Sequence, residues 1–154
     1  MGKKIVAADD EPSIVRLVSA TLTARGYEVV VAYNGEEALD KIHIEKPDLV
    51  VLDIMMPRMD GREVRRKLAA DPKTKDIPVL FLSAVGDLDN QLNTLQESGG
   101  GDEYLTKPFK PSELGDYVDA MLDPSKRGDV ATMRKQHMNK LRTMTNIMHR
   151  GQGL

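Results

Sequence analysis

Short apolar runs alternate with longer amphipathic segments along residues 1–122 of the chain. The runs are rich in Val, Ile and Leu and lie at 5–8, 27–32, 49–54, 79–82 and 104–105. Most of them are apolar without alternation, which is typical of strands that are covered on both faces of a sheet. The amphipathic segments predict helices at 12–25, 35–45, 61–70, 87–97 and 111–122.

This order of elements indicates an α/β fold. The strand–helix repeats imply a parallel sheet with right-handed crossovers and helices on both of its faces. The flavodoxin-like, doubly wound (βα)5 arrangement, with strand order 2-1-3-4-5, is the one that we expect for such units. In that order the first and third strands are neighbours, and ligands bind at the carboxyl ends of the strands.

The chain changes character after residue 122. Residues 123–154 contain no strand-like run, and mostly apolar residues recur there at intervals of three and four, at Val130, Met133, His137, Leu141, Met144 and Met148. This stripe predicts a helix of roughly five turns. We therefore expect one domain over residues 1–122 and a Met-rich helical extension over 123–154 that is not an independent domain.

The two parts carry opposite charge. From Pro124 to Leu154 seven Lys and Arg residues stand against one acid, whereas the rest of the chain has 15 basic and 23 acidic residues. A change of sign at the point where the composition changes indicates two functional pieces. His43, His137 and His149 stand singly, without a metal-ligand partner at usable spacing, and we expect them at a surface or an interface.

Composition narrows the class of protein. The absence of cysteine excludes disulfides, thiolate metal sites and cysteine nucleophiles, and it is typical of cytoplasmic proteins. No segment approaches the ~20 apolar residues that are needed to span a bilayer, and the first apolar stretch is too short for a signal peptide. We therefore expect a cytoplasmic protein.

Polar side chains follow the predicted strands at the points where they end. Asp9 and Asp10 follow the first strand, Asp53 the third, Ser83 the fourth and Lys107 the fifth. One such acid alone is typical of a helix cap, but carboxylates that converge in one crevice repel each other and need a cation to stay ionised. Because hard oxygen ligands suit Mg²⁺, the constellation predicts a magnesium site.

A metal-bound carboxylate that faces a lysine and a hydroxyl can accept a phosphoryl group. The metal and the Lys107 ammonium neutralise the equatorial oxygens of the transition state, and the Ser83 hydroxyl donates to one of them. Asp53 is the expected nucleophile, since Asp carboxylates form acyl phosphates.

Two other uses of this fold conflict with the residues. A flavin phosphate site needs a Ser/Thr/Gly-rich loop after the first strand, and the loop Asp9-Asp10-Glu11-Pro12 would repel a phosphate. A phosphatase of the haloacid-dehalogenase kind needs a second acid two residues after its nucleophile, and Met55 occupies that position.

Four short motifs together resemble the receiver domain of bacterial two-component response regulators. They are Asp9-Asp10-Glu11, Asp53-Ile54-Met55-Met56-Pro57 with Asp60-Gly61, Ser83-Ala84, and Lys107-Pro108-Phe109. Each motif is weak alone, but the four in this order at strand ends are specific. The resemblance covers residues 3–122 and is to a stand-alone receiver of the chemotaxis type with a short C-terminal helical extension.

The resemblance implies a role for each matching acid. Asp53 matches the phosphoacceptor. Mg²⁺ would be bound directly by Asp10, by Asp53 and by the backbone carbonyl of Met55, with Asp9 holding a bound water. The protein would catalyse its own phosphorylation and a slow dephosphorylation without being a turnover enzyme, since Met55 and Val85 are apolar where polar side chains could orient an attacking water.

The resemblance also implies a switch. Ser83 would move toward the phosphoryl oxygens, Lys107 would pair with them, and the rotamer of Tyr104 would follow activation. The Lys107–Pro108 peptide would be cis. The interval from Ser83 to Lys107 is about two residues longer than in the family, with three glycines at 99–101, which indicates either a loop insertion or an altered fourth helix, the region that reads out the switch.

The function predicted in this way is a phosphorylation-dependent signalling switch that acts through protein–protein interaction. Its partners would be a sensor histidine kinase or a phosphotransfer protein, an unidentified downstream protein, and a second copy bound through the fourth and fifth helices or the extension. A receiver-like interaction module that is never phosphorylated is the main alternative.

Three roles for residues 123–154 stay open. The helix packs on the receiver or on a second copy, or it docks on a partner protein, or it binds DNA or another anionic surface. Basic side chains support the last role, at Arg127, Arg134, Lys135, Lys140, Arg142 and Arg150. Because the segment has no aromatic residue for base stacking and no recognition motif, we do not expect it to bind nucleic acid.

Overall fold

The computed structural model describes residues 2–84 and 102–152 of the chain. Its strands are β1 (Lys4–Ala8), β2 (Glu28–Ala32), β3 (Leu49–Asp53), β4 (Val79–Ser83) and β5 (Glu103–Thr106). Its helices are α1 (Pro12–Ala24), α2 (Gly35–Glu45), α3 (Gly61–Ala69), α5 (Pro111–Leu122), the short 3₁₀ turn η2 (Pro124–Lys126) and α6 (Arg127–Gln152). The helix predicted at 87–97 lies outside the described residues.

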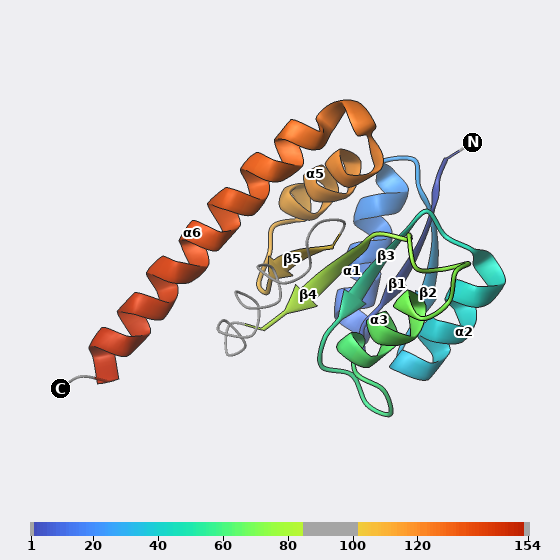
Figure 1. Ribbon diagram of the computed structural model, residues 1–154, viewed down its shortest axis with the longest axis horizontal. Helices are drawn as coiled ribbons and strands as arrows, with labels where there is room; N and C mark the ends of the chain where they lie inside the picture. The colour runs from blue at the N-terminus through green and yellow to red at the C-terminus, as the bar shows by residue number, and fades with distance from the viewer. Residues whose placement is uncertain (1, 85–101, 153–154) are drawn as a thin grey trace.

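The five strands form one parallel sheet in the order β2-β1-β3-β4-β5. The predicted flavodoxin-like fold is therefore confirmed. Helices α1 and α5 cover one face of the sheet, and α2 and α3 cover the other (Figure 1). Every side chain of β3 and β4 is buried, which is why these strands read as apolar runs without alternation.

Local capping places the helices that start beside the sheet's carboxyl edge. The Asn34 side chain accepts a hydrogen bond from the Glu37 backbone N–H at 2.9 Å, which caps α2. The Asp60 side chain caps α3 in the same way, with the Glu63 backbone N–H at 2.9 Å. These caps fix where the chain turns after β2 and after the loop that follows β3.

The strand register brings the acidic residues together. Ala8 pairs with Leu52 across β1 and β3, so Asp9 and Asp53 follow at adjacent positions on neighbouring strands. Ser83 pairs with Thr106 across β4 and β5, so Lys107 is the next residue along the same edge. The sheet alone therefore gathers residues that are far apart in the sequence.

The C-terminal extension is a single helix of 26 residues, about seven turns where the stripe predicted roughly five. It packs on α5 and on β5, and its far end projects beyond the sheet (Figure 1). The Tyr117 hydroxyl of α5 donates a hydrogen bond to the Met133 backbone oxygen of α6 at 3.0 Å. In this structure the helix thus packs on the domain formed by its own chain.

None of the helices that the structure describes combines the length and the apolar character needed to cross a membrane.

Gly61 offers a direct test of the packing beneath the site. A Cβ atom at Gly61 would lie 2.4 Å from the backbone oxygen of Asp53, so we expect Gly61→Ala to lower the free energy of unfolding by about 1–3 kcal/mol. A Cβ atom at Gly128 in α6 would meet nothing within 4 Å. Gly128→Ala is therefore the matched control and should stabilise the protein by up to about 1 kcal/mol. Urea unfolding measures both, and equal effects of the two substitutions would contradict the close approach.

Candidate functional site

Three carboxylates meet at the carboxyl edge of the sheet. Asp9, Asp10 and Asp53 each offer an oxygen, and these oxygens all lie within 4.8 Å of one another. Asp9 and Asp53 are buried, with 1% and 4% of their surface exposed, whereas Asp10 is exposed. The cluster is therefore closed on the side of the sheet and open to solvent on the side of Asp10.

One ammonium group faces the buried pair. The Lys107 Nζ atom lies 2.7 Å from Asp9 Oδ2 and 3.5 Å from Asp53 Oδ2. Its position follows from β5, because the Lys107 backbone N–H donates a hydrogen bond to the Ser83 carbonyl at 2.7 Å. The Lys107–Pro108 peptide is cis.

Burial and like charge dominate the electrostatics of this group. Burial, and then the negative charge of Asp9, raise the pKa of Asp53 to about 7, against the opposing effect of the Lys107 charge. Burial alone would lower the pKa of Lys107, but the hydrogen bond to Asp9 and the charges of Asp53 and Asp9 outweigh it and raise this pKa. The lysine is thus firmly cationic, and the two buried acids need more positive charge than it supplies.

The donor set fits Mg²⁺. Both oxygens of Asp9 are engaged, one by Lys107 and the other by the Glu11 backbone N–H at 2.9 Å. That Asp10 and Asp53 hold the ion directly, with Asp9 holding a bound water, stays a prediction that these contacts of Asp9 support. Mg²⁺ prefers a few carboxylate oxygens and keeps several waters, and the exposed side of the cluster leaves room for these.

Met55 lies beside the cluster with its side chain turned outward. Its backbone N–H contacts Asp53 Oδ1 at 3.3 Å, and 69% of its surface is exposed. The use of its carbonyl as a metal ligand stays a prediction. Val85, the other apolar residue predicted to flank the site, lies outside the described residues, as do the glycines at 99–101.

The two predicted switch residues are buried on adjacent strands. Ser83 ends β4 with 1% of its surface exposed, and Tyr104 in β5 is exposed to the same extent. The Tyr104 ring stacks on Phe81 of β4, with ring centroids 4.9 Å apart and an angle of 28° between the ring planes. Tyr104 thus has the inward orientation in this structure.

The sequence analysis named Gly61 only as part of a motif and missed both its contact with the Asp53 backbone and the partner of Arg134. Gly61 lets α3 begin against the Asp53 backbone. Arg134, counted among the basic residues of the extension, forms an ion pair with the buried Glu103 of β5. A glutamate directly before the short apolar run at 104–105 is the signal that could have found this pair, because a carboxylate that is buried in a strand requires a partner.

The comparisons with known proteins agree with this geometry. The model of the response regulator receiver domain family matches residues 5–119. The chain belongs to this family. The receiver's similarity to solved structures extends to a response regulator from Chloroflexus aurantiacus, with a TM-score of 0.72 and 34% identity, covering 79% of this chain and 98% of that one.

Two further proteins are similar to this chain, one in structure and one in sequence. The receiver domain of a sensor histidine kinase from Pseudomonas aeruginosa, which has a magnesium ion in its active site cleft, matches with a TM-score of 0.70 and 25% identity over 79% of this chain and 98% of that one. The alkaline phosphatase synthesis transcriptional regulatory protein PhoP of Bacillus subtilis is 41% identical over 139 residues, covering 90% of this chain and 55% of PhoP. The chain spans about half the length of the curated relatives it matches.

The raised pKa of Asp53 predicts an unusual dependence of stability on pH. The ordinary pKa is 3.8 and that in the folded protein is about 7, so the folded state holds this proton more tightly than the unfolded state. Without divalent cations the free energy of unfolding should therefore fall as pH rises from 4 to 7, by on the order of 2 kcal/mol. Asp53→Asn should remove this loss and be the more stable protein at pH 8.

Urea unfolding in a chelator, repeated with Mg²⁺, measures this difference between wild type and Asp53→Asn. Magnesium should restore the stability of the wild type at pH 8 and stabilise Asp53→Asn less, because the variant lacks one charged ligand. Parallel pH profiles of the two proteins in the chelator would contradict the assignment.

Proposed function

We propose that this receiver is a phosphorylation-dependent signalling switch that accepts a phosphoryl group on Asp53. The donor is a sensor histidine kinase or a phosphotransfer protein. The observation that carries the proposal is the position of Asp53, a buried carboxylate that lies 3.5 Å from the Lys107 ammonium and shares the open acidic cluster with Asp10.

The chain's own groups account for the transfer. Lys107 favours the ionised form of Asp53, whose carboxylate oxygen attacks phosphorus. The new O–P bond forms as the P–N bond of a phosphohistidine donor breaks, and the electron pair of that bond leaves with the imidazole. Lys107 and the Ser83 hydroxyl then contact the phosphoryl oxygens. Mg²⁺, when bound, supplies positive charge that neutralises these oxygens.

The same contacts explain how phosphorylation of Asp53 would change the structure beyond the site. A phosphoryl group adds up to about two negative charges beside a lysine that pairs with Asp9 at 2.7 Å in this structure. Lys107 and Ser83, joined by a backbone hydrogen bond, reorient together toward the new oxygens, and β4 and β5 adjust with them. The result is a shift between two packings of the domain, read by a downstream protein.

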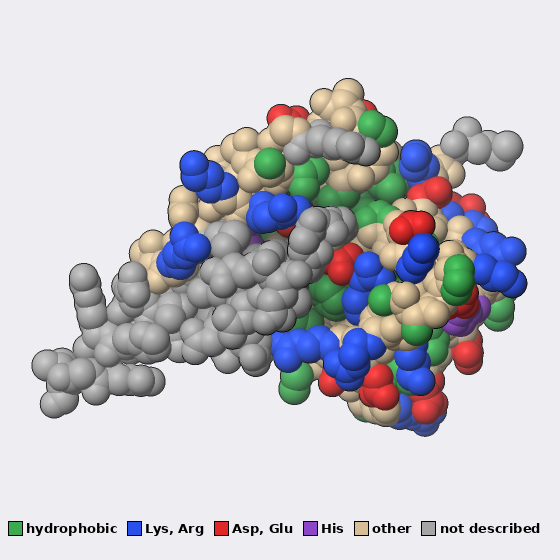
Figure 2. Space-filling model, viewed as in Figure 1, with side chains coloured by type: hydrophobic (Ala, Val, Ile, Leu, Met, Phe, Trp, Pro, Cys, Tyr) green, Lys and Arg blue, Asp and Glu red, His purple; other side chains and the backbone are tan. Residues whose placement is uncertain are grey.

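One ion pair within the chain weakens the alternative that α6 binds an anionic surface. Arg134 forms an ion pair with Glu103, so the charge of one of the seven basic residues of the extension is balanced within the chain. Lys135, Lys140 and Arg142 remain exposed, and Lys and Arg side chains stand along the upper part of α6 in Figure 2. This leaves a basic helix face that also carries polar, uncharged residues.

Phosphoryl transfer from acetyl phosphate in the presence of Mg²⁺ tests the proposal. Wild type should incorporate one phosphoryl group, and Asp53→Asn should incorporate none because the amide cannot form an acyl phosphate. Lys107→Ala should react roughly a hundredfold more slowly, since one charged group that stabilises the transition state is lost. Asp40→Asn, which changes an exposed aspartate of α2, should react like the wild type.

Intact-protein mass spectrometry measures the incorporation. Equal labelling of Asp53→Asn and wild type would place the acceptor elsewhere. A wild type that neither gains label nor is stabilised against heat by beryllofluoride with Mg²⁺ would favour the alternative, a receiver that acts as an interaction module without being phosphorylated.

A further inference from the structure

Strand β5 carries Lys107 into the site, and it is an edge strand. Within the part of the chain that the structure describes, β5 pairs with β4 alone. Its four residues are nevertheless all buried. Two of them, Glu103 and Thr106, contact side chains of α6. The helix therefore covers the edge that has no further strand.

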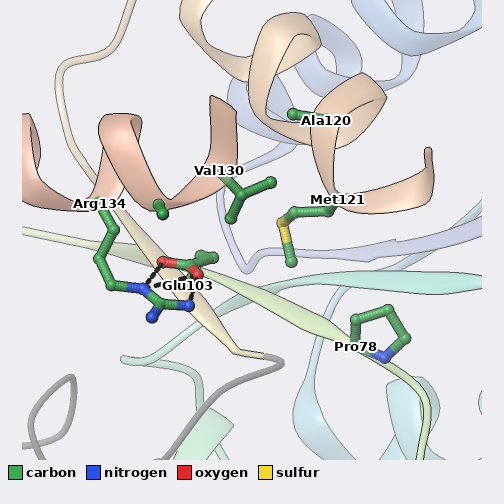
Figure 3. A pocket seen from close by; sticks show the side chains of 7 residues that line it. Pro78, Glu103, Ala120, Met121, Val130 and Arg134 are labelled. Atoms are coloured by element: carbon green, nitrogen blue, oxygen red, sulfur yellow. Dashed lines mark hydrogen bonds and ion pairs between the residues drawn. The ribbon is translucent and has the colours of Figure 1, made fainter. Parts of the chain in front are cut away.

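The contact at the start of β5 is a forked ion pair. The Arg134 Nε atom donates to the Glu103 oxygens at 2.9 and 3.0 Å, and its Nη2 atom donates to Oε1 as well (Figure 3). Glu103 is 2% exposed, and burial raises the pKa of its carboxyl although Arg134 opposes the shift. A carboxylate this deeply buried depends on the guanidinium for its charge.

A cavity lies beside this ion pair, so α6 depends more on its polar contacts with Glu103 and Thr106 to stay on β5. It has a volume of about 380 Å³ and lies between α5, α6 and the start of β4, with Pro78, Met121 and Val130 among its lining residues (Figure 3). Apolar packing therefore leaves a gap between α6 and the sheet at this end. The Arg134–Glu103 pair bridges the two elements where side-chain packing does not.

The contact at the other end of β5 is next to the lysine itself. His137 of α6 is 8% exposed, and its Nε2 atom lies 3.4 Å from the Thr106 hydroxyl. Thr106 immediately precedes Lys107, whose backbone N–H is held by Ser83 on the β4 side. The segment that presents the lysine thus lies between β4 and α6.

We propose that α6 is a positioning element of the phosphoacceptor site, in which Arg134 and His137 hold β5 so that Lys107 reaches Asp53. This inference rests on the proposed function of Asp53. A phosphoryl group recruits Lys107, and the free energy of that contact depends on how firmly Thr106 and Glu103 are anchored. Residues 123–154 therefore act on the chemistry of the site without touching the reacting atoms.

His137→Leu is the sharper variant, because it removes the contact with Thr106, fills the position with an apolar side chain and leaves no buried charge unpaired. Arg134→Gln is the second variant. In the full chain, each should raise the dissociation constant for beryllofluoride in saturating Mg²⁺ roughly tenfold, the size of coupling that a packed network carries. Lys135→Ala, which removes an exposed charge from the same helix, should leave the dissociation constant unchanged. His137→Gln, which keeps a polar group near Thr106, should bind beryllofluoride almost as tightly as the wild type.

Two measurements separate positioning from general loss of stability. Fluorine NMR gives the beryllofluoride constant, and calorimetry gives the Mg²⁺ constant without beryllofluoride. The Mg²⁺ constant should stay within about twofold of the wild type, because Asp10 follows β1 and Asp53 ends β3, and neither strand neighbours β5 in the sheet. Circular dichroism establishes that each variant is folded, and if Arg134→Gln does not fold then His137→Leu decides.

A double-mutant cycle with Lys107→Ala shows whether α6 acts through the lysine. On that background His137→Leu should have little further effect on beryllofluoride affinity. Full additivity of the two changes, or a wild-type affinity in both α6 variants, overturns the inference while leaving Asp53 as the phosphoacceptor. Failure of the wild type to bind beryllofluoride overturns both, and the acetyl phosphate experiment identifies that case independently.

Discussion

Asp9 and Asp53 are buried side by side at the ends of adjacent strands, where their mutual repulsion must be balanced by positive charge. The Lys107 ammonium, 2.7 Å from one carboxylate and 3.5 Å from the other, supplies part of that charge. A divalent cation at the open side, where Asp10 lies, would supply more. Because the negative charge of this site is only partly neutralised, a group that brings further negative charge changes the contacts of Lys107. A phosphorylation switch needs this property.

The distances between these charged groups depend on the strands that carry them and on how the rest of the fold fixes those strands. Register places Asp9 beside Asp53, and Gly61 permits α3 to start against the Asp53 backbone. Lys107 is held less directly, because it follows an edge strand of four residues. Among the described residues β5 pairs with β4 alone, and α6 contacts β5 through Glu103 and Thr106.

The position of the C-terminal helix α6 bears on the role of the basic residues that it carries. An excess of basic residues in a tail is often a sign of an anionic partner, but here one of these residues pairs with a buried acid of the same chain. The helix also lies on α5 and β5, so the surface of those elements is occupied by the chain itself. A partner or a second copy that uses this surface therefore has to accommodate or displace α6.

Much of this protein could be predicted from its sequence. Apolar runs, most of them without alternation, predicted each described strand, and strand order with the carboxyl-end rule predicted that Asp9, Asp10, Asp53 and Lys107 would gather. These predictions succeed because burial on both faces of a sheet imposes a local pattern that nearby residues reveal. The boundaries of β5 were less accurate, since the polar residues Glu103 and Thr106 flank its two apolar residues.

Only the tertiary structure decided which partner each charged group finds. The pairing of Arg134 with Glu103 joins residues 31 positions apart. The sequence does not distinguish Arg134 from the other basic residues of the extension, because only the packing of α6 on β5 brings it to Glu103. The pairing of Lys107 with Asp9 as well as Asp53 was likewise open, because both acids lie at the same edge of the sheet as Lys107. Charge interactions depend on distance and burial across the whole fold, and neither quantity is encoded in the local pattern from which strands and helices can be predicted.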